Sequence, residues 1–175
     1  MRIFVYIIFI FLLFSGVSYA GGVYILGDSV SASLYSSAKT ALSGCGDLEL
    51  TEDIRGIVIR IPLESPEENY YSISSALSAK LRCIEYFLVK IKNPVIIEVH
   101  TDKVPEYLRM KNWEFSSVIA GNIGEEFMHY TPKIPVERIY TVGYGEFMPD
   151  INTSNNGGKS SNRIDIIILC NKSGE

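Results

Sequence analysis

Residue types that build metal and nucleic-acid sites are scarce in this 175-residue sequence. It contains two histidines, and its three cysteines form no CxxC pair. This scarcity excludes a zinc centre built from several histidines and argues against a cysteine-based metal site. Basic residues are not in excess either, because the sequence has 16 Lys and Arg against 20 Asp and Glu, which gives a formal net charge of −4. We therefore expect no metal, no cofactor and no nucleic acid among its ligands.

Long hydrophobic runs are also few, and the clearest one lies near the start of the sequence. An unbroken apolar run covers residues 3–14, after a short positive start, and Ser18-Tyr19-Ala20 follows it. This arrangement is typical of a secretory signal peptide, so we predict that residues 1–20 are cleaved off after Ala20. A membrane span needs about 20 apolar residues, and residues 17–26 could extend the run into an uncleaved N-terminal membrane anchor. Under both interpretations the rest of the chain is exported to the periplasm or cell envelope.

The exported part is expected to contain a small segment and one domain. Residues 21–46 form the segment, with a short strand at 23–26 and a helix at 29–42 that the glycines after it end. Residues 47–171 form the main domain, and residues 172–175 are a tail.

The three cysteines are Cys45, Cys83 and Cys170. An oxidising compartment permits one disulfide and leaves one thiol, and the sequence does not fix which two residues pair. Residues 42–45 look like a lipoprotein cleavage box, but such a box must directly follow the hydrophobic part of the signal. A Ser- and Gly-rich stretch with Asp28 and Lys39 intervenes, so we do not expect lipidation.

Hydrophobic periodicity indicates the elements of the main domain. β-branched runs predict strands, and apolar spacings of three and four predict helices. A polar loop is expected over residues 62–69, and Asn112 is expected to cap the second helix. The order β-α-β-α-β-β indicates an α+β domain with helices packed on a sheet, whose last two strands form an antiparallel pair. The predicted strands are 57–61, 95–99, 137–142 and 164–169, and the predicted helices are 74–91 and the one that starts at residue 112.

Four short motifs lie on these elements in a fixed order. They are EVHTD at residues 98–102, NWEFS at 112–116, a stretch from 134 that leads into GYGE at 143–146, and NRIDI at 162–166. The series resembles the C-terminal domain shared by OmpA, Pal and MotB, and its wording is closest to the MotB branch. The resemblance spans residues 47–169. It implies a two-layer sandwich with a mixed sheet and helices on one face, and a non-catalytic protein that binds peptidoglycan.

The resemblance also implies a ligand site for the diaminopimelate part of the wall peptide. Diaminopimelate is a zwitterion, so its pocket needs an acid for the ammonium and a cation for the carboxylate. By resemblance Asp102 is the acid, Thr101 precedes it, Asn112 shapes the site, and Arg163 is a cation from the last strand. Arg163 has a second interpretation, in which it only pairs with Asp165 or a nearby acid.

The sequence departs from the family at one important position. Ile119 stands where the family has the arginine that clamps the ligand carboxylate, and isoleucine offers no forked donors. Lys103, Arg109, Lys111 and Lys159 are the cations that could compensate, although nothing in the sequence places them at the site. A rival hypothesis follows, in which the domain is a scaffold of an envelope machine for secretion or motility that no longer binds peptidoglycan. Other envelope proteins would then be its partners, and a homo-oligomer fits both hypotheses.

Two further functions are disfavoured. Gly27-Asp28-Ser29-Val30 resembles the nucleophile block of GDSL-type hydrolases, but neither histidine has an aspartate three places before it to complete the required pair. We interpret that block as a strand-turn-helix join and expect no enzyme. A proton-driven stator needs an acid within its membrane span, and residues 3–19 contain none.

Overall fold

The computed structural model describes residues 29–64, 66–130, 134–148 and 162–170. The predicted signal, the predicted strand at 23–26, residues 149–161 and the predicted tail lie outside these residues. None of the helices in the described ranges is both long and apolar enough to cross a membrane.

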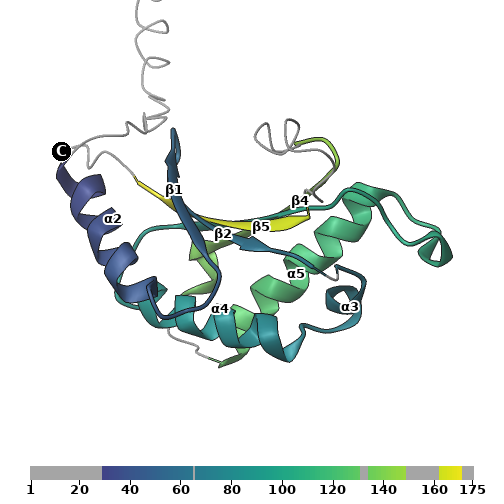
Figure 1. Ribbon diagram of the computed structural model, residues 1–175, viewed down its shortest axis with the longest axis horizontal. Helices are drawn as coiled ribbons and strands as arrows, with labels where there is room; N and C mark the ends of the chain where they lie inside the picture. Colours follow the sequence, from purple (N-terminus) through teal and green to yellow (C-terminus); the bar gives the residue numbers. More distant parts are fainter. Residues whose placement is uncertain (1–28, 65, 131–133, 149–161, 171–175) are drawn as a thin grey trace, which may run out of the picture.

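The described residues form one five-stranded mixed sheet, in the order β1-β2-β5-β3-β4. The pairs β1–β2, β2–β5 and β5–β3 are antiparallel, and β4 runs parallel to β3. Figure 1 shows the helices gathered on one side of this sheet. The α+β prediction with helices on one face is therefore confirmed. The strands are β1 (Glu49–Asp53), β2 (Gly56–Pro62), β3 (Val95–His100), β4 (Ile139–Gly145) and β5 (Arg163–Leu169), and the main helices are α2 (Ser29–Leu42), α4 (Ser75–Leu88) and α5 (Asn112–Tyr130).

The hydrophobic core lies between the sheet and the helices. Every second residue of the three central strands points into it, as the two-residue period of a strand requires. Phe115, Ile119 and Ile123 of α5 meet this face and are fully buried. The strand residues concerned are Ile57, Ile59, Ile61, Val95, Ile97, Val99, Ile164, Ile166 and Ile168.

The prediction that the last two strands form an antiparallel pair is wrong. Strand β5 lies between β2 and β3 and is antiparallel to both, whereas β4 is at the sheet edge beside β3. Six of the seven β5 residues are buried, so this strand needs a partner on each side. Strand β4 has exposed residues at Tyr140 and Thr141, which an edge position tolerates.

Two elements were not predicted. Strand β1 adds a hairpin with β2 at the start of the domain. A short helix, α3 (Pro66–Tyr71), lies within and beyond the predicted polar loop at residues 62–69. Proline at a first helical position and Glu67 and Glu68 in the first turn are favourable signals for that helix.

The prediction that Asn112 caps α5 is also wrong. Its side chain bonds Thr101 instead, and Glu114 takes part in the capping by accepting a hydrogen bond from the Lys111 N–H at 2.8 Å. A glutamate that reaches back over the first turn in this way is half of a capping box. The Asn112 side chain is thereby available to join the helix to the sheet.

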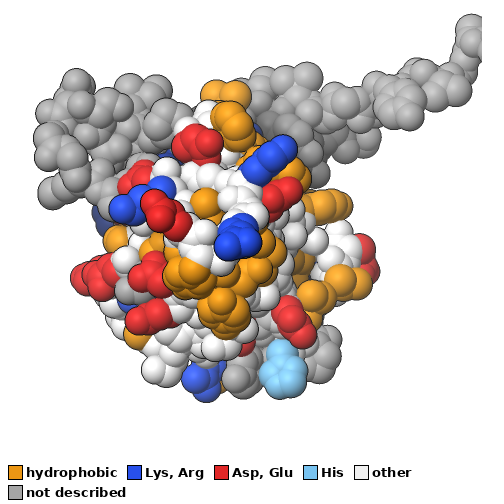
Figure 2. Space-filling view, turned by 90° about the vertical axis from the view of Figure 1, so that its right-hand side faces the viewer, with side chains coloured by type: hydrophobic (Ala, Val, Ile, Leu, Met, Phe, Trp, Pro, Cys, Tyr) orange, Lys and Arg blue, Asp and Glu red, His pale blue; other side chains and the backbone are white. Residues whose placement is uncertain are grey.

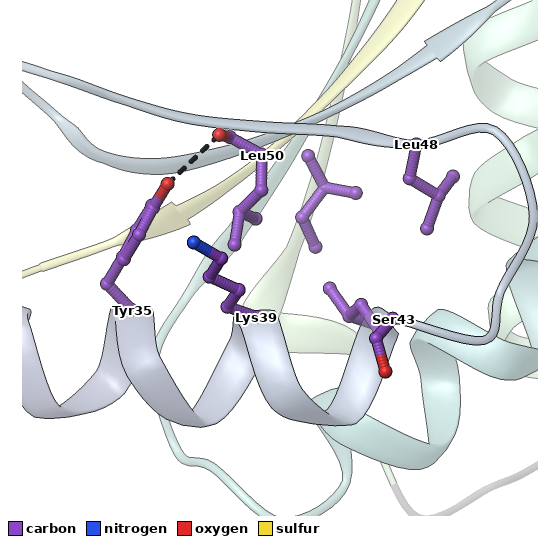
Figure 3. A pocket seen from close by; sticks show the side chains of 7 residues that line it. Tyr35, Lys39, Ser43, Leu48 and Leu50 are labelled. Carbon is purple, nitrogen blue, oxygen red and sulfur yellow. Dashed lines mark hydrogen bonds between the residues drawn. The ribbon is translucent and has the colours of Figure 1, made fainter.

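Helix α2 packs beside the β1–β2 hairpin and against α4. The Tyr35 hydroxyl donates to the Leu50 carbonyl of β1 at 3.1 Å, and Lys39 lies between helix and strand (Figure 3). The open pairing of the cysteines resolves here, because Cys45 after α2 is bonded to Cys83 of α4. Cys170 is a buried free thiol.

Candidate functional site

The predicted site residues lie where β3 ends and α5 begins. Thr101 directly follows β3 and is fully buried. Its hydroxyl donates to Asn112 Oδ1 at 2.6 Å, and Asn112 Nδ2 donates back to the Thr101 carbonyl at 2.8 Å. These two bonds fix the start of α5 against the end of β3, so Thr101 and Asn112 act as a structural pair at the rim of the sheet.

The end of β4 is held at the same place. The Thr101 N–H donates to the Gly145 carbonyl at 3.2 Å, and the Gly145 N–H donates to Ser116 Oγ at 2.9 Å. Gly145 has a φ of +54°, and a Cβ there would lie 2.8 Å from the backbone nitrogen of Trp113. Only glycine meets both demands at low cost. The Thr-Asp, Asn-Trp and Gly-Tyr-Gly motifs therefore meet at one rim.

Asp102 follows Thr101 and is exposed. Its backbone N–H donates to Asn162 Oδ1 at 2.7 Å. Asn162 directly precedes β5, so this bond joins the predicted acid to the segment that carries Arg163. The structure thus brings Thr101, Asp102 and Asn112 together at the rim.

A groove of about 470 Å³ lies beside this rim. Its lining includes Glu64 and Glu67 from the β2–α3 side, Lys103 and Tyr107 from the β3–α5 connection, and Asn162. Neither the two carboxylates nor the ammonium has an ion-pair partner within the described part of the chain. Figure 2 looks onto this end of the molecule, where hydrophobic side chains gather at the centre with acidic and basic side chains around them.

Arg163 points elsewhere. It is 8% exposed, and its Nε donates to Asp165 Oδ2 at 3.0 Å while an Nη donates to the Met148 carbonyl at 2.9 Å. It does not line the groove beside Asp102. The geometry therefore agrees with the interpretation in which Arg163 pairs with Asp165.

Arg163 belongs to a row of charges on the sheet face turned away from the helices. Arg60, Asp165 and Glu98 lie directly opposite one another on β2, β5 and β3. Arg60 Nε donates to Asp165 at 2.8 Å, and Arg55 donates to Glu98 at 2.6 Å. Opposite charges across neighbouring strands stabilise a sheet, and each buried acid here has a guanidinium partner.

His100 lies at the end of this row and packs on Tyr144, with ring centroids 5.3 Å apart. It is 2% exposed, and neither ring nitrogen has a hydrogen-bond partner within the described ranges. Burial and the charge of Arg163 lower the pKa of His100 to about 4. Burial alone would raise the pKa of Asp165, but Arg60 and Arg163 bring it below its usual value.

Glu98, His100 and Asp165 are close enough for their ligand atoms to lie within 4.8 Å of one another. The arginines that hold the two carboxylates, however, place three positive charges around them. A divalent cation would have to displace those partners and withstand that repulsion. We therefore interpret the cluster as an ion network that supports the rim.

Ile119 is fully buried in the core between α5 and the sheet. The position at which the resemblance expects a carboxylate clamp is thus an apolar core position in this chain. An arginine placed there would bury a charge among hydrophobic side chains, which is costly.

Sequence reasoning missed most of the groove. It named Lys103 among four cations without placing it, and it did not name Glu64, Glu67, Tyr107 or Asn162. These residues come from separate connections, and no local spacing links them. The one usable signal was that Asn162 directly precedes the Arg-Ile-Asp motif.

Comparison with known proteins supports the fold. No protein-family model and no curated protein matches the chain. Among solved structures, a MotB-like protein from Desulfovibrio vulgaris matches at 21% identity, covering 80% of this chain and 94% of that one, with a TM-score of 0.67. The cell wall anchor of the T6SS from Pseudomonas aeruginosa matches at 20% identity over 78% and 96% of the two chains, with a TM-score of 0.60. The periplasmic domain of Helicobacter pylori MotB matches at 16% identity over 76% and 85%, also with a TM-score of 0.60.

These similarities define the class of domain. The chain has the OmpA/MotB-type fold that its motifs predicted, with a mixed sheet and helices on one face. At these identities the similarity shows the fold alone.

Proposed function

We propose that this chain is a non-catalytic cell-envelope protein that binds the peptide stem of peptidoglycan at the groove beside Asp102. The observation that carries the proposal is the convergence of Glu67, Lys103 and Tyr107 on one groove next to that aspartate. Two acids, one base and an exposed aromatic ring suit a peptide that carries both amine and carboxylate groups.

The fold supports the same proposal. The Pseudomonas aeruginosa neighbour is named as a cell wall anchor, and the Helicobacter pylori neighbour is a periplasmic domain. The N-terminal apolar run would export this chain to the same compartment, as a free periplasmic protein or one attached to a membrane. In the proposal Asp102 contacts the ligand, and Thr101 and Asn112 hold the rim. Arg163 stabilises the rim through its bonds on the sheet face turned away from the helices.

A second function is favoured by a specific observation. Ile119 supplies no clamp, and Arg163 is committed to Asp165. A domain in which neither of these positions offers an arginine to the ligand could act as an interaction scaffold for another envelope protein and leave peptidoglycan unbound.

Sedimentation with purified cell-wall sacculi separates the two functions. The proposal expects the wild-type protein in the pellet and Asp102→Ala largely in the supernatant. Glu52→Ala is the control, because Glu52 is an exposed acid on β1 opposite Ile57, at the other end of the sheet, and this variant should pellet like the wild type. A wild-type protein that stays in the supernatant would leave the scaffold function in its place. An Asp102→Ala variant that pellets as well as the wild type would contradict binding at the groove beside Asp102.

A further inference from the structure

The charges that line the groove determine what kind of peptide it accepts. Glu64 and Glu67 contribute two carboxylates, and Lys103 is the only basic side chain among the described residues of the lining. None of the three is paired with another described residue. The lining therefore has an excess of unpaired negative charge and favours a ligand that brings ammonium groups.

Within the described part of the chain, no second cation is among the residues that line the groove. The guanidinium of Arg163 is buried and bound to Asp165 and the Met148 carbonyl. Ile119, where the resemblance expects an arginine, is apolar and buried in the core. Among the described lining residues, Lys103 alone can neutralise a ligand carboxylate, so this part of the groove has the means to bind one such group.

A wall peptide can present one carboxylate or two near its diamino residue. The carboxylate of the terminal D-alanine, which follows the diamino residue in a tetrapeptide stem, is common to all of them. Diaminopimelate adds a second carboxylate beside its side-chain ammonium, whereas lysine, ornithine and amidated diaminopimelate do not. The second carboxylate would lie near Glu64 and Glu67 without a partner, and like charges at that distance repel.

We propose that the groove selects wall peptides whose diamino side chain ends in an ammonium group without a free carboxylate. Lysine-type, ornithine-type and amidated diaminopimelate peptides belong to this class. The proposal rests on the proposed function, since it specifies the ligand of the same groove.

The test compares three soluble tetrapeptide stems that differ only at the third residue: L-lysine, meso-diaminopimelate and amidated meso-diaminopimelate. Binding to the purified protein is measured by calorimetry at low and at physiological salt. We expect the lysine and amidated peptides to bind at least ~10-fold more tightly than the meso-diaminopimelate peptide, which is about 1.4 kcal/mol. Equal or tighter binding of the meso-diaminopimelate peptide overturns the selectivity but leaves the proposed function standing. No binding of any of the three peptides overturns both.

A charge reversal makes the test specific to the groove. Glu67→Arg adds a cation to the lining and should remove or reverse the preference against the meso-diaminopimelate peptide. Glu68→Arg is the matched control, because Glu68 is the exposed neighbour in the same helix and lines a different hollow. An unchanged preference in Glu67→Arg, or the same change in Glu68→Arg, contradicts the proposal. Ile119→Arg does not serve here, because the buried guanidinium would disturb the core.

Discussion

Thr101 and Asn112 are joined by two hydrogen bonds, one from each side chain, across the junction between β3 and α5. This pair positions the residue that follows it, Asp102, and the connection that contributes Lys103 and Tyr107 to the groove. The rim thus depends on an amide that the sequence suggested as a helix cap.

Replacement of Asn112 by alanine should weaken both the fold and ligand binding. It leaves the buried carbonyl and hydroxyl of Thr101 without their partner, which typically costs about 1–3 kcal/mol of unfolding free energy. Urea denaturation followed by circular dichroism measures this loss. Thr101→Val removes only the hydroxyl bond and should cost less. If the two variants are equally stable, the bond from Asn112 Nδ2 contributes nothing.

Two glycines should respond in opposite ways to the same change. A Cβ on Gly143 would lie 2.1 Å from the Ser117 backbone nitrogen, where β4 meets α5. Gly143→Ala should therefore destabilise the protein by about 1–3 kcal/mol, because a rigid backbone cannot yield cheaply. Gly121 lies in α5, the helix that contains Ser117, and a Cβ there would have no neighbour within 4 Å. Gly121→Ala should therefore stabilise the protein by about 1 kcal/mol. Thermal denaturation of both variants checks the contrast, and a tolerated Gly143→Ala would contradict the close approach.

The fold class could be predicted from the sequence, but the strand order could not. The apolar periods of α4, α5 and β3 appear directly in the sequence, and the four motifs on these elements indicated the fold. A two-residue period does not reveal a strand's neighbours, so the central position of β5 remained hidden. The sequence suggested the pairing of Arg163 with Asp165. It did not reveal the bonds of Arg60 to Asp165 and of Arg55 to Glu98, because those arginines come from a distant strand and turn. The groove was hidden for the same reason, since Glu67 and Lys103 meet only after the chain has folded.

The bond between Cys45 and Cys83 should contribute substantially to stability. It closes a loop with a sequence separation of 38 residues, and a loop of that length corresponds to about 3–4 kcal/mol. Reduction should lower the free energy of unfolding by that amount in the wild type and in Cys170→Ala alike. Thiol titration of the unfolded protein should find one thiol before reduction and three after it. Three thiols without reductant would contradict the pairing.

His100 should make stability depend on pH between about 4 and 6.5. Its pKa is about 4 in the folded protein and about 6.5 when the chain is unfolded. The unfolded state therefore binds more protons in this window. This contribution of His100 is fully present above pH 6.5 and is lost as the pH falls toward 4, by up to roughly 1.4 kcal/mol per pH unit.

The two histidines allow a matched comparison of the pH effect. His100→Phe keeps a ring against Tyr144 and should flatten stability between pH 4 and 6.5 relative to the wild type. His129→Gln removes the exposed histidine of α5 and should leave the slope unchanged. Burial raises the pKa of Glu98, whereas Arg60 and Arg163 lower that of Asp165. These acids can also change the slope, so the difference between each variant and the wild type is the relevant quantity. An identical slope in His100→Phe would assign the effect to those acids.

The central claim is that a wall peptide binds in the groove between α3 and the β3–α5 connection. Backbone amide NMR of the labelled protein, titrated with a lysine-containing tetrapeptide stem, measures this directly. We expect the largest shift changes at Lys103, Tyr107 and Asn162, with none at Tyr35 or Lys39 in the hollow between α2 and β1. A spectrum that does not change at saturating peptide, or one that changes mainly beside α2, would contradict the account.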